Sequence, residues 1–468
     1  RSRARGLRTA AWHNRCMYAP MNAAAPLSPT TGATPAASPG APRHVVVAGA
    51  GFIGLASAIE LRGAGWDVTL VDPGPSGGEQ AASYGNAGWL SSHSILPPAS
   101  PGVWRQVPGW LMDPLGPLAL RWSYLPRALP WLWRYLESAS TQAKVRRTAH
   151  ALRSLLQGAA LLHQDLAQRA GASHLLAHQG VLHVYRSRAD FVADAFAWDV
   201  RRQEGIAWTE WDADTLRMRE PDLAPDYGFA VHVAEAGHCR HPGAYAAALA
   251  AHAQAIGVRR ITARATGLRP SGGRLQAVQT DQGDIAADAL VIAAGAYSLP
   301  LAQAAGDRVS LDTERGYHVT LAPVDDAAAQ PAPRTTMMVM DRKLIVHRMD
   351  CGLRVAGQVE IAGNDAPPDW RRAEVLRQHL GALFPAISAD QLSGGRVWMG
   401  RRPSTPDGLP CIGLASGCQG VVHAYGHGHV GLGSSARTGR LVAQLLQGAT
   451  PDIDLAPFSP QRFAASAA

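Results

Sequence analysis

The stretch HVVVAGAGFIGLASAIELRGAGWDVTLVD, residues 44–72, decides the fold of this chain. Val45, Val46 and Val47 form a β-branched run that leads directly into a G-x-G-x-x-G turn, an apolar helical segment and a second apolar strand. The second strand ends in an acid, Asp72. Strand, glycine turn, helix, strand and acid in this order predict a dinucleotide-binding βαβ unit.

Each glycine of the turn has its own task. Gly49 permits the tight turn, Gly51 lets a pyrophosphate approach the backbone, and Gly54 lets the helix lie close to the sheet with its amino end facing the phosphates. Asp72 follows Gly54 by 18 residues and can accept hydrogen bonds from a ribose 2′-hydroxyl. The unit alone does not distinguish FAD from NAD.

Length and composition indicate a large enzyme with a substantial core. A chain of 468 residues suggests about three domains, and 47% hydrophobic residues can fill them. Residues 1–43 hold six arginines and no Asp, Glu or Lys, so they supply +6 of the formal net charge of +8 and leave +2 for the rest. This near-neutral remainder argues against nucleic-acid binding.

Residues 1–43 are also rich in Ala, Pro, Ser and Thr, and they lack apolar periodicity. This composition predicts a disordered leader. Met17 and Met21 lie inside it, which favours an upstream-extended translation start over a transit peptide. Because the sequence shows no secretory signal and no apolar stretch of 18 or more residues, we expect a cytoplasmic protein.

The cysteines and histidines do not predict a metal centre. The five cysteines, at positions 16, 239, 351, 411 and 418, show no C-x-x-C spacing. His238, Cys239 and His241 lie close in sequence, as do His427 and His429, but neither set has a matching second group of ligands. We interpret them as reduced thiols and polar loop histidines, and we expect no bound metal.

Two later segments repeat the pattern of a buried strand that enters a glycine turn. LVIAAGAYS, within residues 287–298, can bring its backbone close to a cofactor, and GVVHAYGHGHVGLG places several amides at the amino end of the helix that follows it. Between them, residues 311–360 alternate in short strands, which is typical of an antiparallel sheet. Helices are expected at about 146–169 and 190–204. The predicted fold class is α/β, a Rossmann-like cofactor domain with a second domain built on an antiparallel sheet.

Seven motifs occur in the order found in one family. They are GAGFIG with Asp72, SYGNAGWLS, LVIAAGAYS, GYHVTL, RVAGQVEI, GRRPSTPDGLPCIG and GHGHVGLG. In this order, from about His44 to Gly448, they resemble the D-amino-acid dehydrogenases of the D-amino-acid oxidase and glycine oxidase superfamily, and GYHVTL and RVAGQVEI favour the bacterial dehydrogenase branch. The resemblance implies an FAD-binding domain from residues 44–100, 237–305 and 395–455, a substrate domain from 101–236 and 306–394, and a tail from 456–468.

The resemblance also implies a reaction, in which a hydride passes from the Cα of a D-amino acid to flavin N5 and the imine then hydrolyses to a 2-oxo acid and ammonia. It places Arg402 over the flavin, where the planar guanidinium can hold the substrate carboxylate through two hydrogen bonds. It places Tyr317 where the phenol can donate to the same carboxylate. The alternatives are a surface salt bridge for Arg402, a role that suits Arg401, and a packed strand tyrosine for Tyr317. We expect His318 and His347 to be structural.

By the same resemblance, FAD contacts the first glycine turn, the loop beside the isoalloxazine, the returning strand and the loop at the pyrimidine edge. The cofactor-binding residues so implied are Val45, Gly49, Ala50, Gly51, Phe52, Ile53, Gly54, Asp72, Ser83, Asn86, Ala87, Gly88, Ala294, Gly295, His429, Val430, Gly431 and Leu432. No position demands covalent attachment of the flavin. Cyclic imino acids such as D-proline or cis-4-hydroxy-D-proline remain alternative substrates, and an NAD-dependent dehydrogenase and a non-catalytic flavin sensor remain alternative functions.

A segment rich in Trp and Pro, residues 103–136, bears on the electron acceptor. Five of the chain's 13 tryptophans lie between Trp104 and Trp133, interleaved with arginines, a combination suited to a membrane interface. Five prolines in the segment prevent one long helix, so any attachment is peripheral. The hypothesis is that reduced flavin passes electrons to a quinone or respiratory carrier. If the aromatic residues instead pack against the flavin domain, an oxygen-using oxidase is the alternative.

Overall fold

The computed structural model describes residues 43–99, 101–105, 107–113, 116–324 and 330–466. All of them belong to one compact unit, Pro42–Ala468. The leader expected at residues 1–43 lies outside the described residues, apart from Arg43.

The first sheet is built around residues 44–72 and confirms the predicted βαβ unit. Its six strands have the order β10-β2-β1-β14-β21-β20, and every neighbouring pair is parallel except β20 and β21. Val45, Val46 and Val47 are fully buried, as a strand covered on both faces requires. The strands are β1 (His44–Ala48), β2 (Asp67–Val71), β10 (Arg259–Ile261), β14 (Ala289–Ile292), β20 (Cys411–Leu414) and β21 (Val421–Tyr425).

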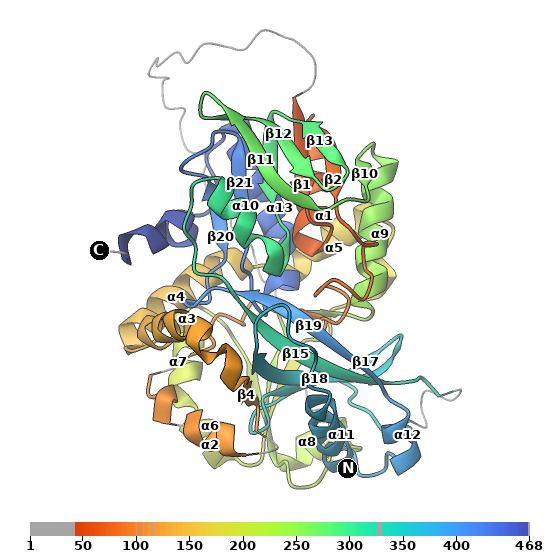
Figure 1. The fold of residues 1–468 in the computed structure, drawn as a ribbon. Helices are drawn as coiled ribbons and strands as arrows, with labels where there is room; N and C mark the ends of the chain where they lie inside the picture. Colours follow the sequence, from red (N-terminus) through yellow and green to blue (C-terminus); the bar gives the residue numbers. More distant parts are fainter. Residues whose placement is uncertain (1–42, 100, 106, 114–115, 325–329, 467–468) are drawn as a thin grey trace, which may run out of the picture. The chain divides into compact units, whose positions relative to one another are not determined.

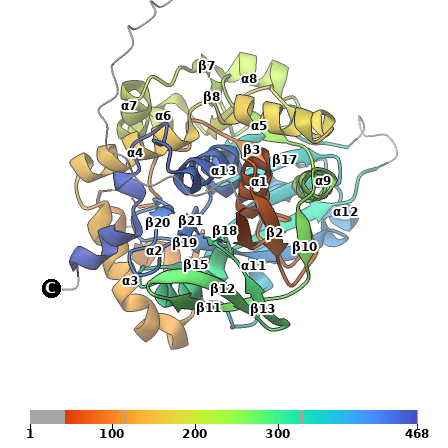
Figure 2. The ribbon, with the colours of Figure 1, turned by 90° about the horizontal axis from the view of Figure 1, so that it is seen from above.

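Helices cover one face of this sheet and a small antiparallel sheet covers the other (Figures 1 and 2). Val45 and Val47 pack towards the helices, whereas Val46 packs towards the small sheet. Helices α1 and α13 touch at Gly439, where a Cβ atom would lie 2.7 Å from the backbone of Ala56. The helices are α1 (Phe52–Gly63), α5 (Ala159–Arg169), α9 (Pro242–Ala255) and α13 (Gly431–Gln447), and the small sheet is β11 (Ala265–Ser271), β12 (Arg274–Thr280) and β13 (Gly283–Ala286).

The second large sheet confirms the antiparallel sheet expected from residues 311–360. Its strands have the order β19-β15-β18-β17-β16-β6-β8-β7, and β4 pairs with β18. All pairs are antiparallel except β16 with β6 and β18 with β4. The strands are β4 (Leu118–Leu120), β6 (Val181–Tyr185), β7 (Thr209–Trp211), β8 (Phe229–Val233), β15 (Asp312–Leu321), β16 (Met337–Val339), β17 (Leu344–Met349), β18 (Gly352–Ile361) and β19 (Arg396–Ser404).

One face of this sheet packs against helix α11 (Arg371–Leu383), and the other faces the first sheet (Figure 1). Tyr317 and Val319 lie in the hydrophobic cluster that includes the buried residues of α11. A short sheet of β3 (Trp89–Leu90), β9 (Gly237–Cys239) and β5 (Leu176–Ala177) lies apart from both. The remaining α-helices are α2 (Val107–Met112), α3 (Leu125–Ser138), α4 (Gln142–Leu156), α6 (Arg188–Ala193), α7 (Ala195–Gln203), α8 (Ala213–Arg219), α10 (Leu299–Ala304) and α12 (Ala389–Ser393).

Two expected helices and one expected boundary differ from the structure. The helical run at 146–169 is two helices, α4 and α5, because Gly158 between them adopts a left-handed conformation with φ of 71°. The helix at 190–204 is likewise divided, into α6 and α7, at Asp194. Strand β19 pairs with β15 in the second sheet, although residues from 395 onward were assigned to the cofactor domain. The division into two domains otherwise stays a prediction.

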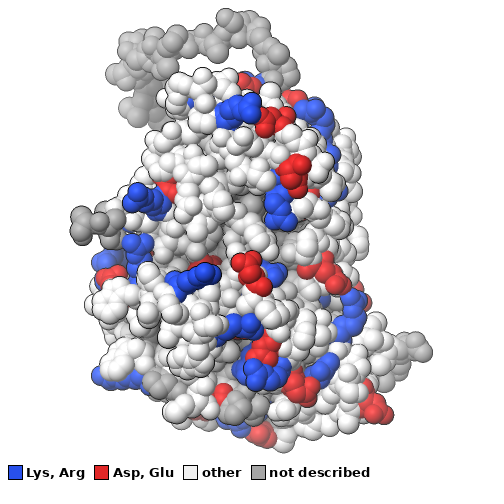
Figure 3. Space-filling view, in the orientation of Figure 1, with Lys and Arg blue, Asp and Glu red and all other residues white. Residues whose placement is uncertain are grey.

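The surface carries both signs of charge. On the face drawn in Figure 3, Lys and Arg alternate with Asp and Glu, and neither sign forms a continuous area. Many exposed arginines are paired with acids, such as Arg396 with Glu79 and Arg269 with Asp284. A nucleic acid needs a basic surface, and this face does not supply one.

Candidate functional site

A cavity of about 920 Å³ runs between the two large sheets. Its walls include the glycine turn at Gly49 and Gly51, the returning strand at Ala294 and Gly295, and Arg402 on β19. A volume of this order suits a large organic cofactor together with a small substrate. The cavity therefore brings the candidate cofactor residues and the candidate carboxylate ligand to one place.

The glycine turn has no room for side chains. Gly49 has φ of 110°, and a Cβ atom there would lie 2.3 Å from the carbonyl oxygen of Ala293. A Cβ atom on Gly54 would lie 1.8 Å from the carbonyl oxygen of Gly49. Helix α1 has no side-chain cap at Gly51, so the first turn directs amide groups towards the cavity. An anionic group such as a pyrophosphate fits this end of the helix.

Asp72 is held at the end of β2 by two backbone amides. Its Oδ2 accepts a hydrogen bond from the amide of Ala50 at 2.8 Å, and its Oδ1 accepts one from the amide of Gly74 at 2.9 Å. Each carboxylate oxygen keeps a further lone pair, and the residue lines the cavity. The side chain is thus fixed in place and can still accept hydrogen bonds from a ribose.

The loop from Ser83 to Gly88 is fastened to helix α1 and to the second large sheet. The amide of Phe52 donates to Ser83 Oγ at 3.2 Å, so Ser83 lies at the glycine turn. Asn86 Oδ1 accepts from the amide of Gly88 at 2.7 Å. His347 Nδ1 lies 3.1 Å from the Ala87 carbonyl oxygen and donates to it. The loop therefore forms one wall of the cavity in a defined conformation.

Most of the expected cofactor residues line the cavity, and a few stand behind its surface. The lining set is Gly49, Gly51, Phe52, Ile53, Asp72, Ser83, Asn86, Ala87, Ala294, Gly295, His429, Gly431 and Leu432. Val45, Ala50, Gly54, Gly88 and Val430 do not line it. Val45 is a fully buried strand residue, and Gly54 serves the packing of α1.

His427, just before α13, is buried, whereas His429 is exposed and lines the cavity. Burial lowers the pKa of His427 to about 3. The Nε2 atom of His427 is hydrogen-bonded to Thr438 Oγ1 at 3.1 Å. At neutral pH the His427 ring therefore adds no charge to the cavity.

Arg402 lies directly on the backbone of the neighbouring strand. It pairs in register with Glu314, and a Cβ atom on Gly316 would lie 2.1 Å from its Nη2 atom. Its Nη1 donates to the Gln358 carbonyl oxygen at 3.2 Å. Gln358 has φ of 62°, beside an irregularity in the pairing of β15 and β18. This distortion turns a carbonyl group towards the guanidinium.

Among the described residues, Arg402 forms no ion pair within 4 Å, although Glu314 lies near enough to interact with its charge. Burial raises the pKa of Glu314, and Ser404 Oγ donates to its Oε2 at 2.6 Å. Burial also lowers the pKa of Arg402, but a guanidinium stays protonated in proteins. The group is a cation without a carboxylate partner, which is what a substrate carboxylate needs.

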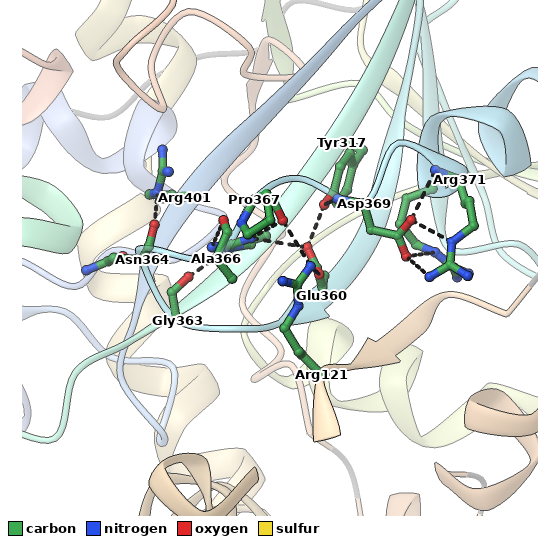
Figure 4. A network of polar contacts seen from close by, with 12 residues as sticks. Arg121, Tyr317, Glu360, Gly363, Asn364, Ala366, Pro367, Asp369, Arg371 and Arg401 are labelled. Carbon is green, nitrogen blue, oxygen red and sulfur yellow. Dashed lines mark hydrogen bonds and ion pairs between the residues drawn. The ribbon is translucent and has the colours of Figure 1, made fainter. Parts of the chain in front are cut away.

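Arg401 and Tyr317 belong to a different network (Figure 4). Tyr317 donates to Glu360 Oε2 at 2.5 Å and accepts from the amide of Asp369 at 2.9 Å. Arg401 donates to the Asn364 carbonyl oxygen at 2.9 Å, so it makes a backbone contact and not the expected surface salt bridge.

Tyr317 points away from Arg402. Because side chains alternate along a strand, Arg402 shares a face with Gly316, whereas Tyr317 shares the opposite face with Met399. The structure does not bring the Tyr317 hydroxyl to Arg402. The expected shared carboxylate site therefore rests on Arg402 alone.

Trp398 is a wall residue that the sequence did not reveal. Its ring stacks on His318 with centroids 4.9 Å apart and fills the space in front of Gly85 and Gly400. Its Nε1 donates to the carbonyl oxygen of Glu79 at 2.9 Å. His318 lies behind this ring with Nδ1 3.2 Å from the Gly85 carbonyl oxygen, a structural role. Trp89, Lys343 and Ile345 also line the cavity.

The described residues hold neither a candidate metal centre nor a candidate membrane-spanning helix. His241 accepts from the amide of Ala244 and caps α9. Within the described part of the chain, no three Asp, Glu, His or Cys side chains are grouped so that they could hold a metal ion. None of the described helices is both long enough and apolar enough to cross a bilayer.

Comparisons with known proteins agree on one family. The model of a family described as "FAD dependent oxidoreductase" matches residues 44–445. A D-amino-acid oxidase of Bradyrhizobium diazoefficiens is 57% identical over 422 residues, which cover 90% of this chain and 99% of that protein. A D-amino acid dehydrogenase of Rhizorhabdus wittichii is 32% identical, over a match that covers 90% of this chain and 100% of that protein.

Solved structures show the same fold. Glycine oxidase from Geobacillus kaustophilus superposes with a TM-score of 0.65 at 23% identity, covering 90% of this chain and 99% of that one. L-proline dehydrogenase from P. horikoshii superposes with a TM-score of 0.68 at 16% identity, covering 91% of this chain and 98% of that one. Fold, cavity and sequence similarity agree, and the chain belongs to the FAD dependent oxidoreductase family as an amino acid oxidoreductase.

Proposed function

We propose that the protein oxidises the Cα–N bond of D-amino acids, and that Arg402 holds the substrate carboxylate. The observation that carries the proposal is the guanidinium of Arg402, which faces the cavity without a carboxylate partner among the described residues. Its planar donors match a carboxylate with two parallel hydrogen bonds. The D-amino acid oxidoreductases with similar sequences support the substrate class.

The residues that would hold FAD in this proposal are the members of the sequence-derived set that line the cavity. The amide of Gly51 at the start of α1 would bind the pyrophosphate, Asp72 would accept from the ribose, and Gly431 and Leu432 would contact the flavin ring. The bare backbone at Gly49 and Gly51 fits a cofactor that must approach closely. Bound FAD supplies the oxidant, which takes up two electrons and the Cα hydrogen.

The chain's own part in the reaction is to bind and orient. Arg402 fixes the carboxylate, and Trp398 restricts the space beside it. The imino acid that leaves hydrolyses to a 2-oxo acid and ammonia. Orientation accounts for most of the catalysis that such a site can give.

The direct test is anaerobic mixing of the FAD-loaded protein with a panel of D-amino acids, their L-enantiomers, D-proline and cis-4-hydroxy-D-proline. We expect the flavin absorption to bleach rapidly with D-amino acids and not with L-enantiomers. Preferential bleaching by the two cyclic compounds would make the protein a cyclic imino acid dehydrogenase. No bleaching by any compound would make it a flavin-binding protein without this activity, and the proposal would be wrong.

For the electron acceptor we propose a quinone or respiratory carrier, reached by peripheral contact with the cytoplasmic face of a membrane. The support is an exposed aromatic surface in the segment 103–136, where Trp104, Trp122 and Trp133 are 59%, 69% and 74% exposed. Exposed aromatic residues beside arginines suit a lipid headgroup region. Two other tryptophans of the segment pack inward: Trp131 stacks on Tyr135, and Trp110 is partly buried.

An oxidase is the second candidate, because the relative with 57% identity is named D-amino-acid oxidase. Turnover with a quinone analogue should be much faster than turnover in air-saturated buffer if the first proposal holds. Stoichiometric hydrogen peroxide at a comparable rate would establish the oxidase. Replacing Trp122 and Trp133 by Ser should reduce co-sedimentation with anionic lipid vesicles, and unchanged sedimentation would remove the membrane contact from the proposal.

A further inference from the structure

A second, smaller cavity opens on the far side of the loop wall, and its lining is basic. Its volume is about 190 Å³, room for about six water molecules. Arg240, Arg334 and Arg348 line it together with His238 and His347. None of its lining residues lines the main cavity. It is therefore separate from the site proposed for the flavin and the amino acid.

The two histidines are buried with unused nitrogen atoms. His238 and His347 are 5% and 2% exposed, and their rings meet edge to face with centroids 4.6 Å apart. Among the described residues, His238 Nδ1 and His347 Nε2 have no hydrogen-bond partner. A buried polar atom without a partner costs free energy, so a ligand that satisfies these atoms is favoured.

The protonation of His347 follows from its neighbours. Its Nδ1 faces the carbonyl oxygen of Ala87, which can only accept, so Nδ1 carries the proton. Burial, His238 and the arginines Arg354 and Arg240 hold the pKa of His347 well below its usual value. The ring is neutral at pH 7, and its Nε2 is a hydrogen-bond acceptor.

The arginines of the cavity supply hydrogen-bond donors, whereas His347 supplies an acceptor. Arg240 pairs with Asp350 at the surface through one Nη atom, and its guanidinium has five N–H donors in all. The backbone amide of Arg334 is held by Glu220, which fixes the segment that presents its side chain. The cavity thus offers donors from Arg240 and Arg334, a further positive charge at Arg348, and one buried acceptor.

We propose that this cavity binds a hydrogen phosphate ion. Its oxygens accept from Arg240 and Arg334, Arg348 adds positive charge, and its P–O–H group donates to His347 Nε2. Inorganic phosphate keeps at least one proton at pH 7. A carboxylate or a sulfate has none, and a phosphate monoester is mostly without one because its second pKa is about 6. A site with an acceptor therefore discriminates among anions that attract the arginines equally.

The experiment is calorimetric titration of the FAD-loaded protein at pH 7.5 with inorganic phosphate, sulfate and glycerol 3-phosphate at equal ionic strength. We expect one phosphate per chain, and dissociation constants at least tenfold higher for sulfate and for the ester. Equal binding of sulfate, or tighter binding of the ester, would overturn the role of His347. Absence of phosphate binding up to millimolar concentration would overturn the site.

Variants locate the binding. Arg334→Ala, at an exposed position, should raise the phosphate dissociation constant at least tenfold. Arg269→Ala is the matched control, because Arg269 is an exposed arginine of the small sheet and is paired with Asp284. It should change the constant less than twofold. An equal effect of both variants would mean that phosphate responds only to net charge and would refute the site.

Discussion

The guanidinium of Arg402 occupies the space that a side chain on Gly316 would need, with Nη2 only 2.1 Å from the position of a Cβ atom. Gly316 thus shapes, together with Arg402, the site proposed for the substrate carboxylate. The absence of a side chain at 316 lets the arginine lie flat on β15 and reach the Gln358 carbonyl oxygen.

Gly316→Ala should move Arg402 and weaken substrate binding without loss of FAD. We expect kcat/KM for the best D-amino acid to fall about tenfold or more, because a misplaced anchor costs both binding and orientation. Steady-state kinetics and the flavin content measure the two effects. Gly63→Ala, at a helical glycine with open space around it, is the control and should be neutral. Wild-type kinetics in Gly316→Ala would place the anchor elsewhere.

Arg402→Ala should remove most turnover and keep the flavin. Two hydrogen bonds to a charged group are worth about 1.5–3 kcal/mol each, so kcat/KM should fall at least about a hundredfold. Arg402→Lys should restore only part, because an ammonium lacks the planar pair of donors. Arg401→Ala is the neighbouring control, and its effect should be much smaller because Arg401 donates to a backbone carbonyl. A larger loss of kcat/KM in Arg401→Ala than in Arg402→Ala would contradict the assignment of Arg402 as the carboxylate ligand.

Asp72→Asn should weaken FAD binding, because an amide keeps the shape but offers one acceptor oxygen where two are used. Loss of a charged acceptor corresponds to about 1.5–3 kcal/mol, or a rise in the FAD dissociation constant of about 10- to 150-fold. Titration of the apoprotein with FAD gives the constant. Asp67→Asn, on the same strand but paired with Arg259 at the surface, should leave it unchanged. Equal FAD affinity in Asp72→Asn and the wild type would exclude the ribose contact.

Tyr317→Phe should affect stability more than catalysis. It leaves Glu360 with two arginines, at 3.5 Å each, and removes the acceptor of the Asp369 amide, so the free energy of unfolding should fall by about 1–3 kcal/mol. Denaturant unfolding measures this loss. KM should stay within about twofold of the wild type. A large rise in KM without a loss of stability would show instead that the hydroxyl binds the substrate.

Acid should destabilise the protein through buried histidines. His163 has a pKa of about 4 in the folded state because it is buried, against 6.5 as the ordinary value. Between these values the unfolded chain binds the proton and the folded chain does not. The stability contributed by neutral His163 is therefore complete above pH 6.5 and is lost as the pH falls towards 4, by at most about 3 kcal/mol.

The matched variant for this pH dependence is His163→Gln, whose amide can still donate to the Leu432 carbonyl oxygen that His163 Nε2 contacts at 2.8 Å. Unfolding free energies measured from pH 7.5 to 4 should decline less steeply in the variant. The same slope in both proteins would assign the acid sensitivity to other groups.

The glycine turn and Asp72 were predictable because their chemistry depends on spacing within one short segment. The sheet of residues 311–360 was predictable from alternation. The contact of Arg402 with Gly316 and Gln358 was not, since it depends on cross-strand register and on a distorted residue with φ of 62°. Tyr317 shows the same limit: its motif is recognisable, but only the pairing of β15 with β19 decides which face of the sheet carries its ring. Helix breaks at Gly158 and Asp194 depend on local conformations that apolar periodicity does not report.

The close contact of α1 with α13 at Gly439 joins segments from the two ends of the described chain. Gly49 and Leu432 line the same cavity, so its wall is complete only when nearly the whole polypeptide has been synthesised. During translation, the first βαβ segment leaves the ribosome long before the strand and helix that complete the cavity. The site proposed for FAD is therefore completed only late in the synthesis of the chain.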